Sequence, residues 1–260
     1  MKLYTNGCSF TQGSIPFEKL EHTQVYKNYE YTTGYDSTLW PWQLSDNFEF
    51  VFNHARYGTG ADRLLRTTID FLSKLDDHDL HDWIFVLQLS KPNRREYICL
   101  EEEKFGQVYP SLVNDDKFCI EYRFTDTDWA DIVEYKTDSL SDVVMDYHAM
   151  WENNISLAVN QIKNIFTLQN IMEVRNIKYL ITGMSNMDLT FYDMHDSVRY
   201  SDTLSQFEQM LNRKNIINSI ELMTKGTDAY YKDDGHLSAE GNKFFANYVK
   251  EELENRNWLT

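Results

Sequence analysis

Short apolar runs that alternate with helical periods limit the folds open to this chain more than any other feature. The run Trp83-Ile84-Phe85-Val86-Leu87 is apolar at every position, so both faces of the strand it predicts must be covered. Strands are predicted at 2–5, 48–53, 83–89, 178–182 and 217–223, and helices at 39–46, 61–75, 141–175, 203–213 and 239–255. This alternation predicts an α/β fold, a three-layer α/β/α sandwich around a mostly parallel, doubly wound, flavodoxin-like sheet.

Two stretches interrupt the alternation. Residues 14–38 lack helical spacing and are predicted to form a long loop beside Ser9. Residues 92–140 contain alternating runs and are interpreted as an inserted hairpin or cap, with a surface excursion of no functional role as the alternative. With 260 residues, of which 42% are hydrophobic, we predict a single domain over 1–260 with an insertion at about 92–140.

Charge and cysteine content narrow the function classes. A formal net charge of −16 argues against a nucleic-acid partner and against adsorption to anionic membranes. The three cysteines show no CxxC spacing and no HExxH motif is present, so we predict neither a metal site nor a cofactor, while a Cys99–Cys119 bridge stays open. The chain shows no apolar run of about 18 residues and no signal peptide, so we expect no membrane span and, by default, a cytoplasmic location.

Two short motifs near opposite ends of the chain suggest nucleophilic catalysis. Gly7-Cys8-Ser9-Phe10 follows the first predicted strand, and Asp233-Asp234-Gly235-His236 precedes the last predicted helix. A serine hydroxyl becomes nucleophilic when a histidine takes its proton, and a carboxylate three residues before that histidine can hold its tautomer. The alternative readings are a turn-forming serine and a helix-capping turn with an exposed histidine.

A third segment, 53–63, follows a predicted strand and opens a predicted helix. Its glycines, Gly58 and Gly60, would present backbone N–H groups that could stabilise an oxyanion or, less well supported without a following lysine, cradle a phosphate. His54 beside this turn is interpreted as a packing or solvent-facing residue.

Together the three segments resemble the SGNH (GDSL-like) hydrolase superfamily over the whole chain in motif order. The resemblance implies that Ser9 is the nucleophile, His236 the base and Asp233 its orienting partner. It also implies that the backbone N–H groups of Ser9 and Gly58 are oxyanion-hole donors, and that the fold is a three-layer sandwich.

The chain departs from the superfamily pattern at the third block. The family pattern Gly-x-Asn-Asp after the third strand is replaced by Ser90-Lys91-Pro92-Asn93-Arg94. Asn93 is the nearest candidate for the asparagine of the oxyanion hole, with Ser90 or Arg94 as alternative donors. The chain therefore resembles a divergent member.

These features favour a serine hydrolase that acts on esters through a Ser-His-Asp triad and an acyl-enzyme. The predicted substrate is a small-molecule or carbohydrate ester, which makes the protein a short-acyl esterase or a carbohydrate O-deacetylase. The alternative hypothesis is a catalytically inactive carbohydrate-binding or structural module of the same fold. An acyltransferase with the same triad is a third.

Overall fold

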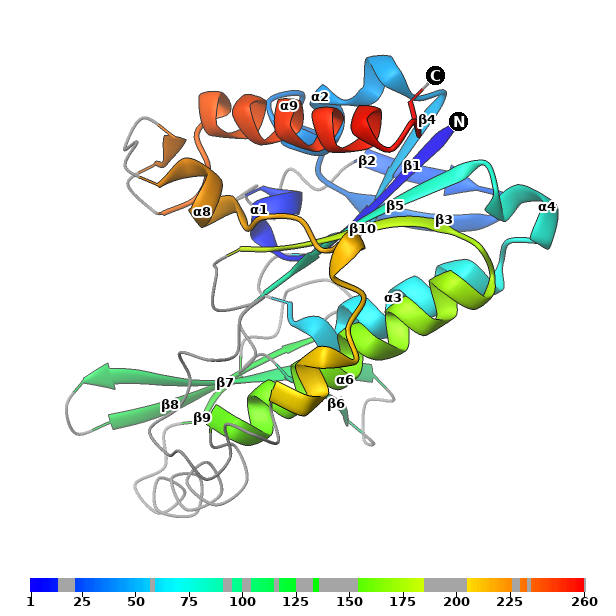
Figure 1. The fold of residues 1–260 in the computed structure, drawn as a ribbon. Coiled ribbons are helices and arrows are strands. Elements are labelled where there is room, and N and C mark those ends of the chain that lie inside the picture. The colour runs from blue at the N-terminus through cyan, green and yellow to red at the C-terminus, as the bar shows by residue number, and fades with distance from the viewer. Residues whose placement is uncertain are drawn as a thin grey trace.

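The computed structural model describes residues 1–13, 22–56, 59–90, 95–99, 104–114, 117–124, 133–135, 154–184, 205–225, 230–232 and 235–259. Its centre is a four-stranded sheet of order β10-β5-β1-β4, and every neighbouring pair in it is parallel (Figure 1). The strands are β1 (Lys2–Asn6), β4 (Phe50–Asn53), β5 (Trp83–Leu89) and β10 (Lys178–Gly183). This confirms the predicted α/β class and four of the predicted strands.

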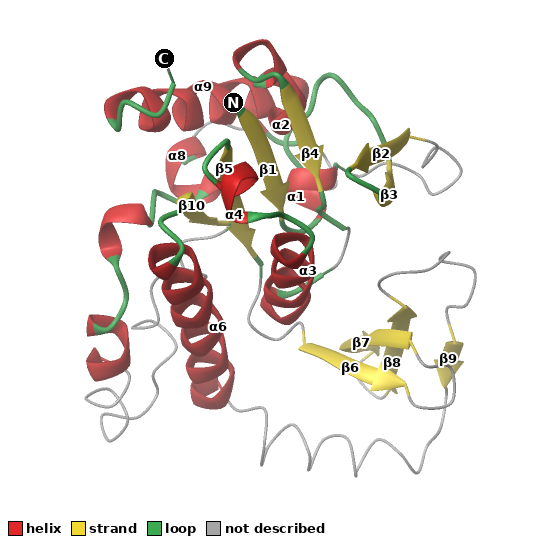
Figure 2. Cartoon of the chain, turned by 90° about the vertical axis from the view of Figure 1, so that its right-hand side faces the viewer, coloured by secondary structure: helices red, strands yellow, loops and turns green. Residues whose placement is uncertain are grey.

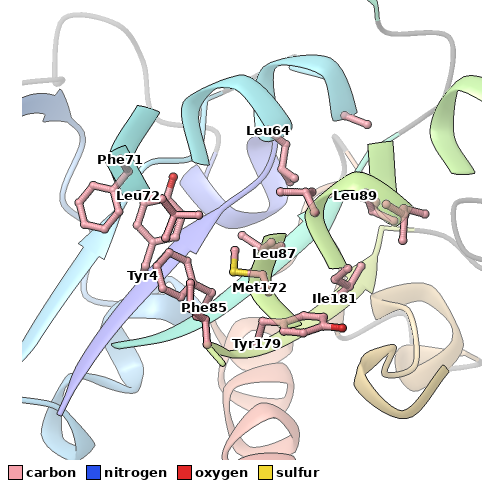
Figure 3. Close-up of a cluster of buried hydrophobic side chains, with 14 of the residues drawn as sticks. Tyr4, Leu64, Phe71, Leu72, Phe85, Leu87, Leu89, Met172, Tyr179 and Ile181 are labelled. Atoms are coloured by element: carbon pink, nitrogen blue, oxygen red, sulfur yellow. The ribbon is translucent and has the colours of Figure 1, made fainter. Parts of the chain in front are cut away.

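The buried side chains of each strand alternate between two apolar clusters, one on each face of the sheet. Both faces are therefore apolar, and helices cover both. On one face, Tyr4 and Phe85 pack under α3 (Ala61–Ser73) and α6 (Asn154–Val174), as Figure 3 shows. The opposite face is covered by α2 (Trp40–Gln43), α8 (Ile220–Thr224) and α9 (Ala239–Asn255). The result is the predicted three-layer sandwich. No helix within the described ranges is long and apolar enough to cross a membrane.

The predicted insertion contains a second, antiparallel sheet of order β6-β7-β8-β9 (Figure 2). An ion pair joins this sheet to α3, with Arg66 Nε 2.7 Å and Nη2 2.8 Å from the two carboxylate oxygens of Glu96. The second sheet and the remaining short elements are β6 (Arg95–Cys99), β7 (Lys104–Asn114), β8 (Lys117–Phe124), β9 (Val133–Tyr135), α1 (Ser9–Gln12), β2 (His22–Tyr26), β3 (Tyr29–Thr33), η2 (Ser45–Asn47), α4 (Asp77–Leu80) and η5 (Arg213–Asn215). The single-domain assignment stays a prediction.

Part of the predicted loop at 14–38 is a β-hairpin, so that prediction was wrong for the strands β2 and β3. The two strands join through Lys27 (φ 47°) and Asn28 (φ 67°), both left-handed, as a tight two-residue hairpin turn requires. Such turns usually carry glycine, and its absence here hid the hairpin in the sequence. Residues 14–21 lie outside the described part.

The fifth predicted strand, 217–223, was also wrong. Ile216 forms one isolated parallel bridge to Ile181, after which the chain turns into α8. The Ser219 hydroxyl caps α8 by accepting a hydrogen bond from the Leu222 N–H at 3.2 Å. Ile220 is then buried among the apolar residues under α9, so packing favours a helix over a strand in this apolar run.

The strand order defines where a ligand should bind. From β1 the chain passes to β4 on one side of β1 and then crosses to β5 on its other side. The carboxyl end of β1 is therefore the topological switch point of the sheet, the place where ligands bind in open parallel sheets. Ser9 follows this end directly.

Candidate active site

Ser9 is the first residue of α1 and is 5% exposed. The helix is one turn long, closed by hydrogen bonds from the Gln12 N–H to the Cys8 carbonyl (3.0 Å) and from the Gly13 N–H to the Ser9 carbonyl (2.7 Å). Because Ser9 begins the helix, its own N–H has no partner within the turn, and no acceptor among the described residues bonds to it. A short helix thus presents both the hydroxyl and a backbone donor at the switch point.

Gly7 allows the end of β1 to lie very close to β5. A Cβ atom at Gly7 would stand 2.9 Å from the backbone oxygen and 2.8 Å from the side-chain oxygen of Gln88. Neither separation is sterically allowed, and the backbone oxygen belongs to a central strand. A side chain at position 7 would therefore displace the turn that carries Ser9.

Gln88 holds the Ser9 turn from the β5 side. Its side-chain oxygen accepts hydrogen bonds from the Cys8 N–H (3.3 Å) and the Thr11 hydroxyl (3.0 Å). Sequence reasoning missed this role, although one polar residue within the otherwise apolar Trp83–Leu89 strand was a usable signal. A polar side chain in a buried strand must find partners, and these partners flank the nucleophile candidate.

Asn53 holds the same turn from the β4 side. The Asn53 amide nitrogen donates to the Thr11 carbonyl at 3.0 Å, and its oxygen accepts from the Thr5 hydroxyl (3.1 Å) and the Ala55 N–H (3.2 Å). The side chain is fully buried. Asn53 therefore ties α1 to the strand on the other side of β1, so that α1 is anchored to both neighbours.

His236 lies in a narrow loop ahead of α9. The loop closes through an antiparallel bridge between Tyr231 and Leu237 and a 2.7 Å hydrogen bond from the Lys232 N–H to the His236 carbonyl. The half-buried imidazole packs against Phe10, with ring centroids 5.3 Å apart. This contact brings the last loop of the chain to the residue that follows Ser9. No hydrogen bond between Ser9 and His236 occurs in the described part of the chain.

The other predicted site residues, Asp233, Gly58 and Asn93, lie outside the described residues. The complete triad and the oxyanion hole therefore stay predictions. Among the described residues no group of three or more His, Cys, Asp or Glu side chains is placed to hold a metal ion.

His54 is a buried residue that packs in the core. The Tyr4 hydroxyl lies 2.9 Å from its Nδ1 atom, and the Tyr29 hydroxyl lies 3.2 Å from Nε2. Burial, with a further contribution from the Arg63 guanidinium, lowers the pKa of His54 well below its usual value. The imidazole is therefore neutral at physiological pH and belongs to the packing under α3.

Sequence comparisons find no matching family model and no matching curated protein. Among solved structures, the chain is similar to a psychrotrophic esterase, EstA, from Pseudoalteromonas sp. (9% identity, 98% of this chain and 97% of that chain, TM-score 0.48). It is also similar to a member of the lipolytic protein G-D-S-L family from Veillonella parvula (10% identity, 96% and 97%, TM-score 0.43). An acetyl xylan esterase, AlAXEase, is similar at 16% identity, 96% and 98% coverage and TM-score 0.43. The fold assignment itself rests on the sheet order and layers described above.

Proposed function

We propose that this protein is a serine ester hydrolase in which Ser9 is the nucleophile, His236 the general base and Asp233 the group that orients His236. One observation carries the proposal. The Ser9 turn and the His236 loop, from opposite ends of the chain, meet at the carboxyl end of β1 through the contact between Phe10 and His236. Nucleophile and base must lie together at a ligand-binding end of the sheet for this chemistry.

The proposed reaction has two halves. Ser9 Oγ attacks the ester carbonyl as His236 takes its proton, and the tetrahedral intermediate expels the alcohol, which receives that proton from His236. Water then attacks the acyl-Ser9 ester with His236 again as base, and release of the acid restores Ser9. The oxyanion would accept hydrogen bonds from the N–H groups of Ser9 and Gly58 and from the Asn93 side chain. The absence of an acceptor for the Ser9 N–H among the described residues supports the first of these roles.

A groove beside the His236 loop supports a carbohydrate as the alcohol part of the ester. The groove has a volume of about 640 Å³ and includes Tyr230, at the start of that loop, and the first turns of α9. Tyr230 and Phe244 stack with ring centroids 4.8 Å apart. Hydroxyl and amide groups of Ser37, Thr38, Gln43 and Asn247 also line the groove, together with the charged residues Glu240 and Lys243. Aromatic faces beside polar groups suit the apolar faces and hydroxyls of a sugar.

Hydrolysis of 4-nitrophenyl acetate tests the proposal. We expect wild-type turnover with an initial burst from acyl-enzyme formation, and a loss of kcat of at least about 10³-fold in Ser9→Ala and in His236→Ala. Ser73→Ala, which changes an exposed serine at the end of α3, is the matched control and should retain wild-type activity. Full activity in Ser9→Ala would contradict the nucleophile assignment. Wild-type protein that binds oligosaccharides but hydrolyses no ester would favour the inactive binding module.

A further inference from the structure

Arg56 is a buried arginine whose backbone contacts the Ser9 turn. The residue is 9% exposed, and its backbone N–H donates to the Gly7 carbonyl at 3.1 Å. The Thr59 hydroxyl reinforces this junction, since it lies within donating distance of both the Gly7 oxygen (3.0 Å) and the Arg56 oxygen (2.8 Å). The backbone of Arg56 is thus held against the residue two positions before Ser9.

The protein compensates the charge of Arg56 only weakly. The guanidinium carbon of Arg56 lies 5.0 Å from the centroid of the Tyr31 ring, and the Nε atom is buried without a hydrogen-bond partner. No carboxylate in the described part of the structure forms an ion pair with Arg56. A cation–π contact recovers much less than the cost of taking a guanidinium out of water, and buried charges are ordinarily paired.

Two nearby arginines show the contrast. The terminal nitrogens of Arg63 donate to the His54 carbonyl at 3.1 Å and to the Tyr31 hydroxyl at 3.4 Å, and Arg66 forms its two-point ion pair with Glu96. The protein therefore supplies acceptors to both of these guanidinium groups. The Arg56 guanidinium forms no hydrogen bond to an acceptor in the described part of the structure.

We propose that Arg56 binds a carboxylate of the ester substrate and so makes the enzyme selective for anionic esters. This inference rests on the proposed function. The Nε and one terminal nitrogen of a guanidinium match the two oxygens of a carboxylate, which makes arginine suited to such a site. A chain of net charge −16 repels anionic ligands at long range, so selectivity for one requires a local, desolvated positive group.

Binding of free succinate, measured by calorimetry, tests the site without any catalysis. We expect saturable binding by wild type, at least tenfold weaker binding by Arg56→Met, and no binding of neutral succinamide. Lys74→Met is the matched control, because it removes one positive charge from an exposed side chain that pairs with Asp70 on the surface of α3, and it should bind as wild type does. Equal affinity of wild type and Arg56→Met would overturn the proposal. Tighter binding of inorganic phosphate than of succinate would overturn the carboxylate assignment.

Two ester pairs test selectivity. In the first pair, mono(4-nitrophenyl) succinate is compared with 4-nitrophenyl butyrate, so the carboxylate lies on the acyl side. In the second pair, 3-acetoxybenzoate is compared with phenyl acetate, so the carboxylate lies on the alcohol side. We expect kcat/KM to favour the anionic member of at least one pair, and that ratio to fall at least tenfold in Arg56→Met. If Arg56→Met leaves the ratio of the two kcat/KM values unchanged, the role of Arg56 is overturned. If wild type hydrolyses no ester, the proposed function is overturned, and succinate binding then decides whether Arg56 binds a carboxylate.

A variant of Arg56 that fails to fold does not block the test. Arg56→Lys keeps the charge and removes the two-point geometry, and it should lose most of the selectivity. Free succinate should inhibit wild-type hydrolysis of 4-nitrophenyl butyrate competitively, and succinamide should not. Failure of succinate to inhibit would overturn the proposal with the unmodified protein alone.

Discussion

The rings of Phe10 and His236 lie 5.3 Å apart between centroids and are inclined by 35°. Phe10 immediately follows the nucleophile candidate, and His236 lies in the loop closed by the Tyr231–Leu237 bridge, just ahead of α9. The contact therefore sets the position of the imidazole relative to the Ser9 turn. It makes Phe10 a positioning residue of the proposed active site.

Removing the Phe10 ring should impair chemistry more than binding. In Phe10→Ala the imidazole loses its packing partner and samples orientations that cannot take the Ser9 proton, so kcat should fall about tenfold with little change in KM. Phe10→Tyr keeps the ring and should retain most of the activity. Steady-state kinetics on 4-nitrophenyl acetate separates the two parameters. A raised KM with unchanged kcat would instead make Phe10 a substrate contact.

Adding one methyl group at Gly7 should destabilise the fold through steric overlap with β5. The Cβ atom of Gly7→Ala would approach the Gln88 backbone oxygen to 2.9 Å, and we expect a loss of about 1–3 kcal/mol in the free energy of unfolding. Gly235→Ala is an informative comparison, because Gly235 has φ +79° but no heavy atom within 4 Å of the added Cβ. It should cost only the backbone strain, about 1 kcal/mol. Urea unfolding measures both, and a fully stable Gly7→Ala would contradict the close approach.

Replacing Gln88 by leucine should leave the Cys8 N–H and the Thr11 hydroxyl without their acceptor. Each buried donor left unsatisfied costs about 1–3 kcal/mol, so Gln88→Leu should lower both stability and esterase activity. A double-mutant cycle with Thr11→Val isolates the shared hydrogen bond, and we expect a non-zero coupling energy in urea unfolding. Strict additivity of the two changes would show that the hydrogen bond contributes nothing.

His54 should make the fold less stable in mild acid. Burial lowers its pKa in the folded state, so as pH falls the unfolded chain takes up a proton first, at a pKa of about 6.5. The free energy of unfolding should then decrease below about pH 6.5, by up to about 1.4 kcal/mol per pH unit from this group. His54→Gln should remove that component of the pH dependence, whereas His78→Gln, at an exposed position on α4, should keep it. Parallel pH profiles for wild type and His54→Gln would contradict this account.

Local sequence patterns were sufficient to predict the strands of the central sheet and several helices. Trp83–Leu89 is buried throughout and apolar except for Gln88. The helix α9 begins and ends at the predicted residues, and Ser238 caps its start by accepting from the Gly241 N–H at 3.1 Å. The β2–β3 hairpin was missed because its turn uses left-handed Lys27 and Asn28 in place of glycine. The run that became α8 was misread because a short apolar segment has no decisive period.

The α/β class and the order of the motifs follow from local sequence patterns, since apolar periodicity and capping residues act over a few neighbours. The packed structure was needed to show that Gln88 and Asn53 hold the Ser9 turn, that Phe10 contacts His236, and that Arg56 is buried beside Gly7. Those contacts join residues far apart in the chain. They depend on the strand order around β1 and on which side chains the packed layers leave without partners, and neither property is encoded in a local pattern.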